Sequence, residues 1–507
     1  MKRTARWYDA ITINVFWLGL STISQSMLPL ILPLLVQRFI GETQKATYFG
    51  VLRLWGLMVA LLAQALMGLI SDRSRSRWGR RRPFILLGTL GDLLILAAFA
   101  ALARSSGFEG LEGFWLLFVL YVFLQFFSNM AQGAAQGLIP DLVPRGAQGR
   151  FSAFKSLFEV PLPVILITFT VSPLISRGNM LHGLLVVGAL LLASALLTML
   201  SPEQPQRRPP QPIDWQPFLR LLLMTGVFTA IILGMRESVL VMGRLLRPVT
   251  ALSWRIGGMA TAGLLAMLFA IGAGVWVGVR ISIGAEKAIR HTGFTWWVIN
   301  RLAFLVGAFN LSGFILYFIQ ARLGYTELTA AEPTSRLMMV VGVTLLLAAV
   351  PSGWLSDRFG RKRVVAVSGV VAAGGVALLL ASTRLVTFYV GGSLIGLATG
   401  TFYTANWALG TSLVPEKEAG RYLGLSNLAG AGAGAVGAYI SGPIADYFTL
   451  HVPQIPGLGY VVIFAVYGLL FLLSALALLG VHPPHVSERS ADVEVGAPPI
   501  ERAGAEI

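Results

Sequence analysis

The stretch "SDRSRSRWGRRRPF", Ser71 to Phe84, places six arginines in fourteen residues between two long apolar runs. It stands out because the 507-residue chain is 55% hydrophobic and only 12% charged. A soluble domain carries about 25% charged residues, so this composition predicts a protein embedded in a lipid bilayer. In such proteins the loops rich in Lys and Arg mark the cytoplasmic side of the membrane. The net charge of +16 therefore indicates membrane topology and not a nucleic-acid partner.

Long apolar runs occur in two sets of six. A spanning helix needs about 20 mainly apolar residues. The runs of this kind lie at 11–36, 46–70, 84–103, 114–139, 157–176, 180–200, 294–320, 337–355, 364–382, 385–411, 422–448 and 458–480. The first run is too long for a signal peptide and is expected to persist as a span. The polar, proline-rich segment from Ser201 to Pro212 is predicted to be a linker.

The two sets are copies of one another. "SDRFGRKR", Ser356 to Arg363, repeats the opening stretch, and each follows the second run of its set. "LVPRGAQGR", Leu142 to Arg150, is matched by "LVPEKEAGR", Leu413 to Arg421, and each follows the fourth run. Two matches in the same order predict parallel repeats with the same orientation, as in several transporter folds.

The basic loops also fix the predicted topology. If Ser71–Phe84 and Ser356–Arg363 are both cytoplasmic, the N-terminus is cytoplasmic and an even number of spans separates the two sets. The same parity places the C-terminus inside the cell. We therefore expect a multi-pass protein of the cytoplasmic membrane with both termini inside.

The segment between the sets is harder to interpret. It contains two further apolar runs, Leu221–Met235 and Ile256–Val279. Parity and length favour two extra central helices and fourteen spans, although the connection between them would face outside with four arginines. In the alternative, neither run spans and 236–249 lies as an amphipathic helix at the interface. The predicted regions are a bundle at 1–200, a linker with two extra segments at 201–293, a bundle at 294–481 and a disordered tail at 482–507.

The quoted loops resemble the loop 2–3 signature of the major facilitator superfamily, in both halves. "SDRSRSRWGRRRPF" is similar to the sugar-carrier branches, the sucrose-type transporters and the glycoside–pentoside–hexuronide symporters. "ANWALGTSLVPEKEAGRYLGLSN", Ala405 to Asn427, also resembles the tenth-helix region of related bacterial carriers. The resemblance implies an all-α fold of two pseudo-symmetric six-helix bundles that rock about a central site.

The basic loops are candidates for a cytoplasmic gate. An acid at the end of one helix can pair with a guanidinium or a helix N-terminus while the inner side is closed. The candidate gate residues are Asp72, Arg73, Arg80, Arg81, Arg82, Asp357, Arg358 and Arg361. The alternative is that these charges only set topology and contact lipid headgroups.

Polar residues on the predicted cavity helices are candidates for solute binding. The resemblance places the first helix of each three-helix unit along the cavity. The candidates are Gln25, Arg53, Asn129, Gln132, Gln136, Asn310, Tyr403, Asn406 and Trp407. Amides with an aromatic ring suit a polyhydroxyl solute, although single amides also hold helices together. Arg53 can equally extend to the outer interface, and for Arg301 we expect a structural role near the inner edge.

Two carboxylates of the first set, Asp92 and Glu159, lie well within apolar runs and are candidates for proton coupling. Glu159 follows Lys155 by four residues, a spacing that favours an ordinary ion pair, so Asp92 is the preferred candidate for proton coupling. The cation-binding carboxylates of melibiose-type symporters, in helices 2 and 4, have no counterparts here. Proton symport, antiport and uniport all stay open.

The sequence predicts a secondary transporter of a small polar solute, with sugars or glycosides first. The alternatives are an exporter of drugs or lipophiles on the same fold, and a membrane assembly factor that transports nothing. An enzyme is not expected, because HExxH, GxSxG and P-loop motifs are missing from the sequence. With no cysteine and no metal-binding motif, we expect no cofactor and no metal. The expected partners of the protein, which we expect to be a monomer, are the solute, the lipid bilayer and, in the case of proton coupling, protons.

Overall fold

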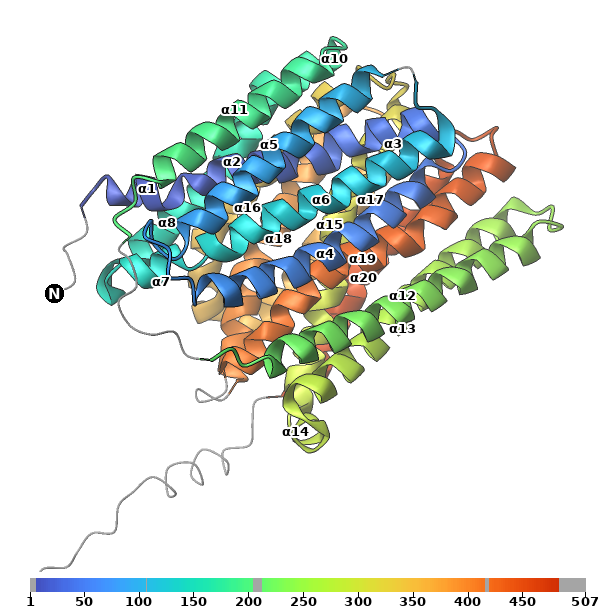
Figure 1. Ribbon diagram of the computed structural model, residues 1–507. Coiled ribbons are helices and arrows are strands. Elements are labelled where there is room, and N and C mark those ends of the chain that lie inside the picture. The colour runs from blue at the N-terminus through green and yellow to red at the C-terminus, as the bar shows by residue number, and fades with distance from the viewer. Residues whose placement is uncertain (1–5, 106, 204–211, 415–418, 483–507) are drawn as a thin grey trace, which may run out of the picture.

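The architecture is a bundle of long helices that run side by side through one body (Figure 1). The computed structural model describes residues 6–105, 107–203, 212–414 and 419–482. Every regular element in these residues is a helix. The fold class predicted from the sequence, an all-helical multi-pass membrane protein, is confirmed.

The first half of the chain, residues up to 200, forms six spans, of which the first and fifth are interrupted. Its helices are α1 (Asp9–Asn14), α2 (Phe16–Ser26), η1 (Met27–Ile31), α3 (Leu32–Ile40), α4 (Lys45–Ser71), α5 (Arg82–Arg104), α6 (Gly110–Ala135), α7 (Leu138–Leu142), η2 (Arg145–Ala147), α8 (Gln148–Glu159), α9 (Pro161–Leu166), η3 (Ile167–Val171), α10 (Ser172–Ser176) and α11 (Met180–Thr198). The interruptions lie near Pro29 and Pro161, because proline removes a backbone donor and its ring clashes with the preceding turn.

The second half, from residue 294 onward, is preceded by a pair of long helices. This central pair is α12 (Gln216–Leu246) and α13 (Leu252–Ile283), followed by the short α14 (Ala285–Arg290). The remaining helices are α15 (Thr292–Leu323), α16 (Ala331–Phe359), α17 (Arg361–Ala381), α18 (Leu385–Ser412), α19 (Ala419–His451), α20 (Leu458–Ala477) and η5 (Leu478–Gly480).

Among the described residues, 13 helices or interrupted helices are long and apolar enough to cross a membrane. The glycine-rich α19 adds another long helix of 33 residues, which packs between α4, α15 and the central pair. Both apolar segments of the insert lie within spanning-length helices, of 31 and 32 residues. The interfacial helix considered for 236–249 is not formed, because α12 continues without a break to Leu246.

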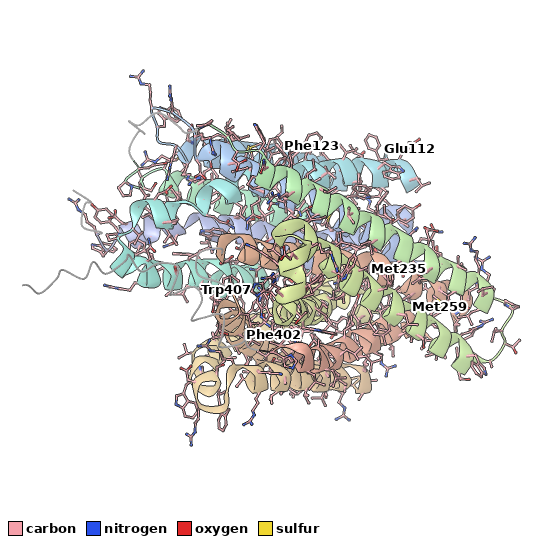
Figure 2. All side chains as sticks on the ribbon, turned by 90° about the horizontal axis from the view of Figure 1, so that it is seen from below. Glu112, Phe123, Met235, Met259, Phe402 and Trp407 are labelled. Carbon is pink, nitrogen blue, oxygen red and sulfur yellow. The ribbon has the colours of Figure 1, made fainter. Side chains whose placement is uncertain are left out.

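The central pair packs on the outside of the bundle, against α4 of the first half and α19 of the second (Figure 1). Met235 on α12 and Met259 on α13 mark the part of the pair nearest its connecting loop in Figure 2. The arginines near this loop are bound locally. Arg255 donates hydrogen bonds to the carbonyls of Val249 and His451, and the Arg236 guanidinium lies 5.2 Å from the Tyr439 ring centre. Two of the four arginines near this loop thus have carbonyl or aromatic partners, and Arg236 also pairs with Glu237 at 2.8 Å.

Two ends of the bundle can be told apart by their loops. We call the end with the loop 72–81, α7 and α14 the basic end, and the end with the loop 41–44 the far end. The two repeated basic loops follow equivalent helices, α4 and α16. Each loop contains a glycine with positive φ, which is 102° at Gly79 and 89° at Gly360. Only glycine adopts such angles readily, so both copies keep the same turn.

Candidate functional site

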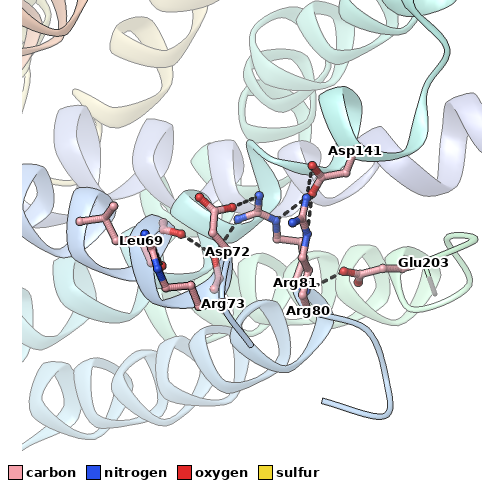
Figure 3. Close-up of polar contacts among 9 residues, drawn as sticks. Leu69, Asp72, Arg73, Arg80, Arg81, Asp141 and Glu203 are labelled. Atoms are coloured by element: carbon pink, nitrogen blue, oxygen red, sulfur yellow. Dashed lines mark hydrogen bonds and ion pairs between the residues drawn. The ribbon is translucent and has the colours of Figure 1, made fainter. Parts of the chain in front are cut away.

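Arg81 is the centre of an ion network at the basic end of the first half (Figure 3). Its guanidinium forms an ion pair with Asp72, and its Nε donates to Asp141 Oδ2 at 3.0 Å. A second terminal nitrogen donates to Ser71 Oγ at 2.8 Å. Arg80 also pairs with Asp141. Arg81 is buried, and the interactions with these partners offset the free-energy cost of removing its charge from water.

Glu203 caps the start of α5. Its carboxylate accepts hydrogen bonds from the backbone N–H groups of Arg81, at 2.7 Å, and Arg82, at 3.2 Å. A side chain at Gly79 would bring a Cβ to 2.5 Å from Glu203 Oε2, so the turn must be glycine for this reason as well. An acid at a helix N-terminus satisfies free donors and complements the helix dipole.

The remaining first-half gate candidate, Arg73, also binds within its surroundings. It donates to the carbonyl of Leu69 at 3.0 Å and to the carbonyl of Pro212, in the linker, at 3.3 Å. The gate residues of the first half are therefore held to their own half and to the linker in this conformation.

The second-half loop is built differently although its sequence is a copy. Asp357 and Arg358 are exposed, and Arg361 donates to the carbonyl of Ala408 at 2.9 Å. In the repeat "LIPDLVP" and "LGTSLVP", the position of Asp141 is taken by Ser412. The acid that organises the first network is thus replaced by a neutral residue in the second. Neither Asp141 nor Glu203 was a candidate from the sequence, and only the aligned repeat gives a hint of Asp141.

At the far end the two halves are joined. The Asp446 carboxylate, from α19, accepts hydrogen bonds from the backbone N–H groups of Ala46, at 3.1 Å, and Thr47, at 2.7 Å, at the start of α4. Asp446 is buried, and 400 residues of chain separate it from Ala46. No spacing or motif marks this residue in the sequence.

Other polar contacts between the halves lie at the same end. The pairs are Lys45 with Gln320 at 3.3 Å, Gln37 with Glu327 at 3.1 Å, Tyr317 with the carbonyl of Pro33 at 2.7 Å, and Thr168 with the carbonyl of Ser335 at 3.1 Å. At the basic end, the hydrogen bonds of the gate candidates stay within one half or reach the linker. Among the described residues, the polar contacts named here that join the halves therefore lie at the far end, and the gate candidates at the basic end add none.

The close approach of α4 and α19 depends on glycine. A Cβ at Gly442 would lie 2.6 Å from the carbonyl oxygen of Ala46. One at Gly434 would lie 2.6 Å from an Arg53 terminal nitrogen. Arg53 is buried and wedged between this glycine and Gly313 of α15, so it does not reach the outer interface. Asn310, one turn from Gly313, donates to the carbonyls of Val306 and Ala433 and so ties α15 to α19.

A cavity of about 260 Å³ lies between the halves, below the far-end contacts. Its polar lining residues are Ser24, Gln25, Ser312 and Ser335, and its apolar ones include Val160, Ile167 and Met338. Gln25 also donates to the carbonyl of Glu159 at 2.8 Å. The Glu159 side chain faces Lys155, 3.6 Å away, and lies within electrostatic reach of Tyr403 on the opposite half.

An amide and aromatic cluster surrounds Arg301 on the second-half wall. Arg301 donates to Asn406 Oδ1 at 3.0 Å, and Asn406 donates to Asn300 Oδ1 at 2.7 Å. The rings of Tyr403 and Trp407 have their centres 5.9 and 5.6 Å from the guanidinium. Trp407 is 43% exposed (labelled in Figure 2). Three of the predicted solute residues therefore meet here, around an arginine to which we had given only a structural role.

The amide stripe of α6 is less uniform than its spacing suggests. Asn129 is buried and donates to the carbonyl of Gln125 in its own helix. Gln132 is half-buried and Gln136 is exposed. Asp92 lies on α5 and accepts a hydrogen bond of 2.9 Å from Ser128 of α6, so it links two helices inside the first half. Among the described contacts, none joins Asn129, Gln132, Gln136 or Asp92 to the cluster around Arg301.

Some predictions concern segments beyond the described residues. These are residues 415–418 of the second copy "LVPEKEAGR", residues 204–211 of the linker and the tail from 483 onward.

Known proteins resemble this chain in sequence and in shape. The Major Facilitator Superfamily profile matches residues 297–504. The minor myo-inositol transporter IolF of Bacillus subtilis (strain 168) is 34% identical over 94 residues, which are 18% of this chain and 21% of that protein. The match thus spans about a fifth of the curated relative.

Solved structures agree over almost the whole chain. The nucleoside transporter NupG has a TM-score of 0.61 at 13% identity, with 94% of this chain and 99% of that one covered. An auto-inhibited POT family peptide transporter has a TM-score of 0.62 at 13% identity, with 99% of each chain covered. The POT family transporter PepTSo has a TM-score of 0.63 at 11% identity, with 97% and 99% covered. The protein therefore has the major facilitator superfamily fold, and its second half carries the sequence pattern of that superfamily.

Proposed function

We propose that the protein is a secondary transporter that moves a small polar solute by alternating access. The observation that carries this proposal is the asymmetry of the seam between the halves. Asp446, Lys45 and Tyr317 join the halves at the far end, whereas the gate candidates at the basic end bond within their own half or to the linker, and a cavity of about 260 Å³ lies between the halves. To open the far end and close the basic end, the two bundles must rotate against each other as rigid bodies. We take residues 1–200 and 294–481 as these two bodies.

The orientation follows from the charge pattern. We assign the basic end to the cytoplasm, because the basic loops of both repeats lie there and such loops stay inside. Both termini are then cytoplasmic and the conformation is inward-facing. The gate loops, Asp72 and Asp357 with their arginines, would meet across the seam only after the basic end closes.

A polyhydroxyl solute is the substrate class that the site favours. Gln25 and Asn406 offer amide groups, and the exposed Trp407 ring can stack on a sugar face. The partial match to a myo-inositol transporter points in the same direction. Proton coupling, if present, is assigned to Glu159 in the seam before Asp92, which is bound to Ser128 within one half.

A second candidate is export of lipophilic compounds. It is favoured by the mainly apolar residues, such as Val160, Ile167 and Met338, along the cavity of about 260 Å³. A carrier for a lipophile would use this surface in place of the amide and aromatic cluster.

The test is flux into proteoliposomes that contain the purified protein. The panel contains neutral sugars, myo-inositol, sugar acids, sugar phosphates and a lipophilic dye, each with and without a pH gradient. Flux of a polar solute above that of empty liposomes supports the proposal, and flux of the dye alone favours the exporter. If no compound moves, the proposal of a carrier is wrong. Gln132→Ala tests the α6 stripe, because an unchanged dissociation constant would leave Gln132 as a contact between helices.

A further inference from the structure

Arg301 has a positive charge that no carboxylate balances. It is only 8% exposed, and among the described residues it forms no ion pair with Asp or Glu. One terminal nitrogen of Arg301 donates a hydrogen bond to Asn406. The Nε of Arg301 has no hydrogen-bond partner. A guanidinium carries five donors and stays protonated at any physiological pH, so most of its binding capacity is unused.

The donors of Arg301 are held in a fixed direction. Asn300 donates to the carbonyl of Ser474 at 2.7 Å and accepts from Asn406, which accepts from Arg301. Trp297 donates to the backbone carbonyl of Asn406 at 3.0 Å. Two amides and an indole thus fix one guanidinium, an arrangement that orients a recognition group.

Arg53 repeats the feature higher in the same seam. It is 3% exposed, its Nε lacks a partner, and within the described chain it makes no hydrogen bond or ion pair. It lies beside Gly313, twelve residues from Arg301 on α15, a separation of about 18 Å along the helix. A buried charge without a partner is strongly disfavoured unless an anion joins it.

The acids near the seam do not supply these partners. Glu159 is paired with Lys155 at 3.6 Å, and Asp92 is bound to Ser128 between α5 and α6. Asp446 is occupied by the backbone at the start of α4. The seam therefore has two guanidinium groups, one toward each end, whose charge is not cancelled from within.

We propose that the transported solute is an organic anion, with its carboxylate or phosphate oxygens received by Arg301 in this conformation. The inference rests on the proposed transport function and narrows its substrate class. The Trp407 ring beside Arg301 stacks on the polyhydroxyl body of the solute, while Arg301 binds the charged group by paired hydrogen bonds. Arg53 is then the receiving group when the far end is open.

The test uses three solutes with one scaffold: D-glucose, D-glucuronate and D-glucose 6-phosphate. Counterflow into proteoliposomes is measured for the wild type, Arg301→Gln and Arg301→Lys. Arg290→Gln is the matched control, because Arg290 is exposed and pairs with Glu286 on its own helix α14 at 2.8 Å. Thermal stability in detergent is measured for every variant, and Trp407→Ala provides a second variant that keeps the charge.

We expect the wild type to prefer one or both anions over glucose. Arg301→Gln should lower that preference by about 10- to 100-fold, the range for a lost hydrogen bond to a charged group. Arg301→Lys should recover part of it, and Arg290→Gln should leave it unchanged. The relative flux of glucuronate and the phosphate identifies which anionic group fits.

Three results would overturn the inference. If glucose moves and the anions do not, the protein is a carrier but its solute is neutral. If a folded Arg301→Gln variant loses flux of all three equally, Arg301 is structural. If Trp407→Ala, with Arg301 intact, abolishes the preference for anions, the charge is not what selects the solute. Loss of flux for every compound of the wider panel in the wild type would instead remove the transport proposal itself.

Discussion

Asp446 accepts a hydrogen bond of 2.7 Å from the backbone N–H of Thr47, so the end of α19 in the second half caps the start of α4 in the first. The two helices run antiparallel, and Asp72 ends α4 on the side where α19 begins. Asp72 pairs there with Arg81 of its own half. Asp446 therefore joins the two halves, whereas Asp72 is bound to its own half.

Removal of the Asp446 carboxylate should open the far end. Asp446→Ala deletes two hydrogen bonds between the halves, and bonds to charged groups are worth about 1.5–3 kcal/mol each. The chain has no cysteine, so Ser312→Cys in the cavity provides a single reporter. We expect an impermeant maleimide added from the far side to label this cysteine about tenfold faster in the Asp446→Ala background.

Glu332→Ala is the control for that measurement. Glu332 lies near the same end but pairs only with Arg336 on its own helix. Equal labelling rates with and without the Asp446 carboxylate would remove this residue from the closing contact.

The crossing of α4 and α19 should not tolerate a methyl group at Gly442. A Cβ there would lie 2.6 Å from the carbonyl oxygen of Ala46, which belongs to backbone and cannot move aside cheaply. Gly442→Ala should destabilise the far-end-closed conformation by about 1–3 kcal/mol, the usual cost of overpacking. Gly430→Ala on the same helix meets nothing within 4 Å and should be neutral or slightly stabilising. The melting temperatures of the two variants in detergent decide the point, and matching values would contradict it.

Asp141 should matter more to stability than Asp72, although only Asp72 was a candidate from the sequence. Asp141 binds both Arg80 and the buried Arg81, so Asp141→Asn leaves a buried charge short of a partner. We expect a loss of about 3 kcal/mol in unfolding free energy. Asp72 has a half-exposed side chain, and Asp72→Asn should cost about 1 kcal/mol or less. Denaturation monitored by tryptophan fluorescence would compare the two variants. A larger loss of unfolding free energy for Asp72→Asn than for Asp141→Asn would contradict the prediction.

Proton coupling can be assigned by comparing two amide variants. Glu159→Gln should abolish the extra uptake that a pH gradient drives, because the Glu159 carboxylate faces Lys155 and lies within electrostatic reach of Tyr403 in the opposite half. It should leave solute exchange at equal pH within about twofold of the wild type, since that step needs no net proton movement. Asp92→Asn keeps a hydrogen-bonding group for Ser128 and should leave the gradient effect intact. A gradient effect that survives in Glu159→Gln and vanishes in Asp92→Asn would reverse the assignment.

The membrane architecture could be predicted from the amino-acid sequence alone. Apolar runs of spanning length, the parity set by two basic loops, and the repeat of "SDR" and "LVP" segments predicted the helices, their order and the paired halves. These properties are local and add along the chain, because each span is stabilised by its own hydrophobicity and its own backbone hydrogen bonds. The same reasoning found the extra central pair, although the arginines of its loop argued against it.

Which polar residues contact each other could be seen only in the folded protein. Asp446 caps a helix that begins 400 residues earlier, and Arg301 keeps unclaimed donors beside Trp407 while Arg81 is surrounded by acids. Asp141 organises the first basic loop, whereas Ser412 stands in its place in the second. These partners lie on different helices that come together only when the bundle packs. The distances between their side chains therefore cannot be inferred from their spacing along the chain.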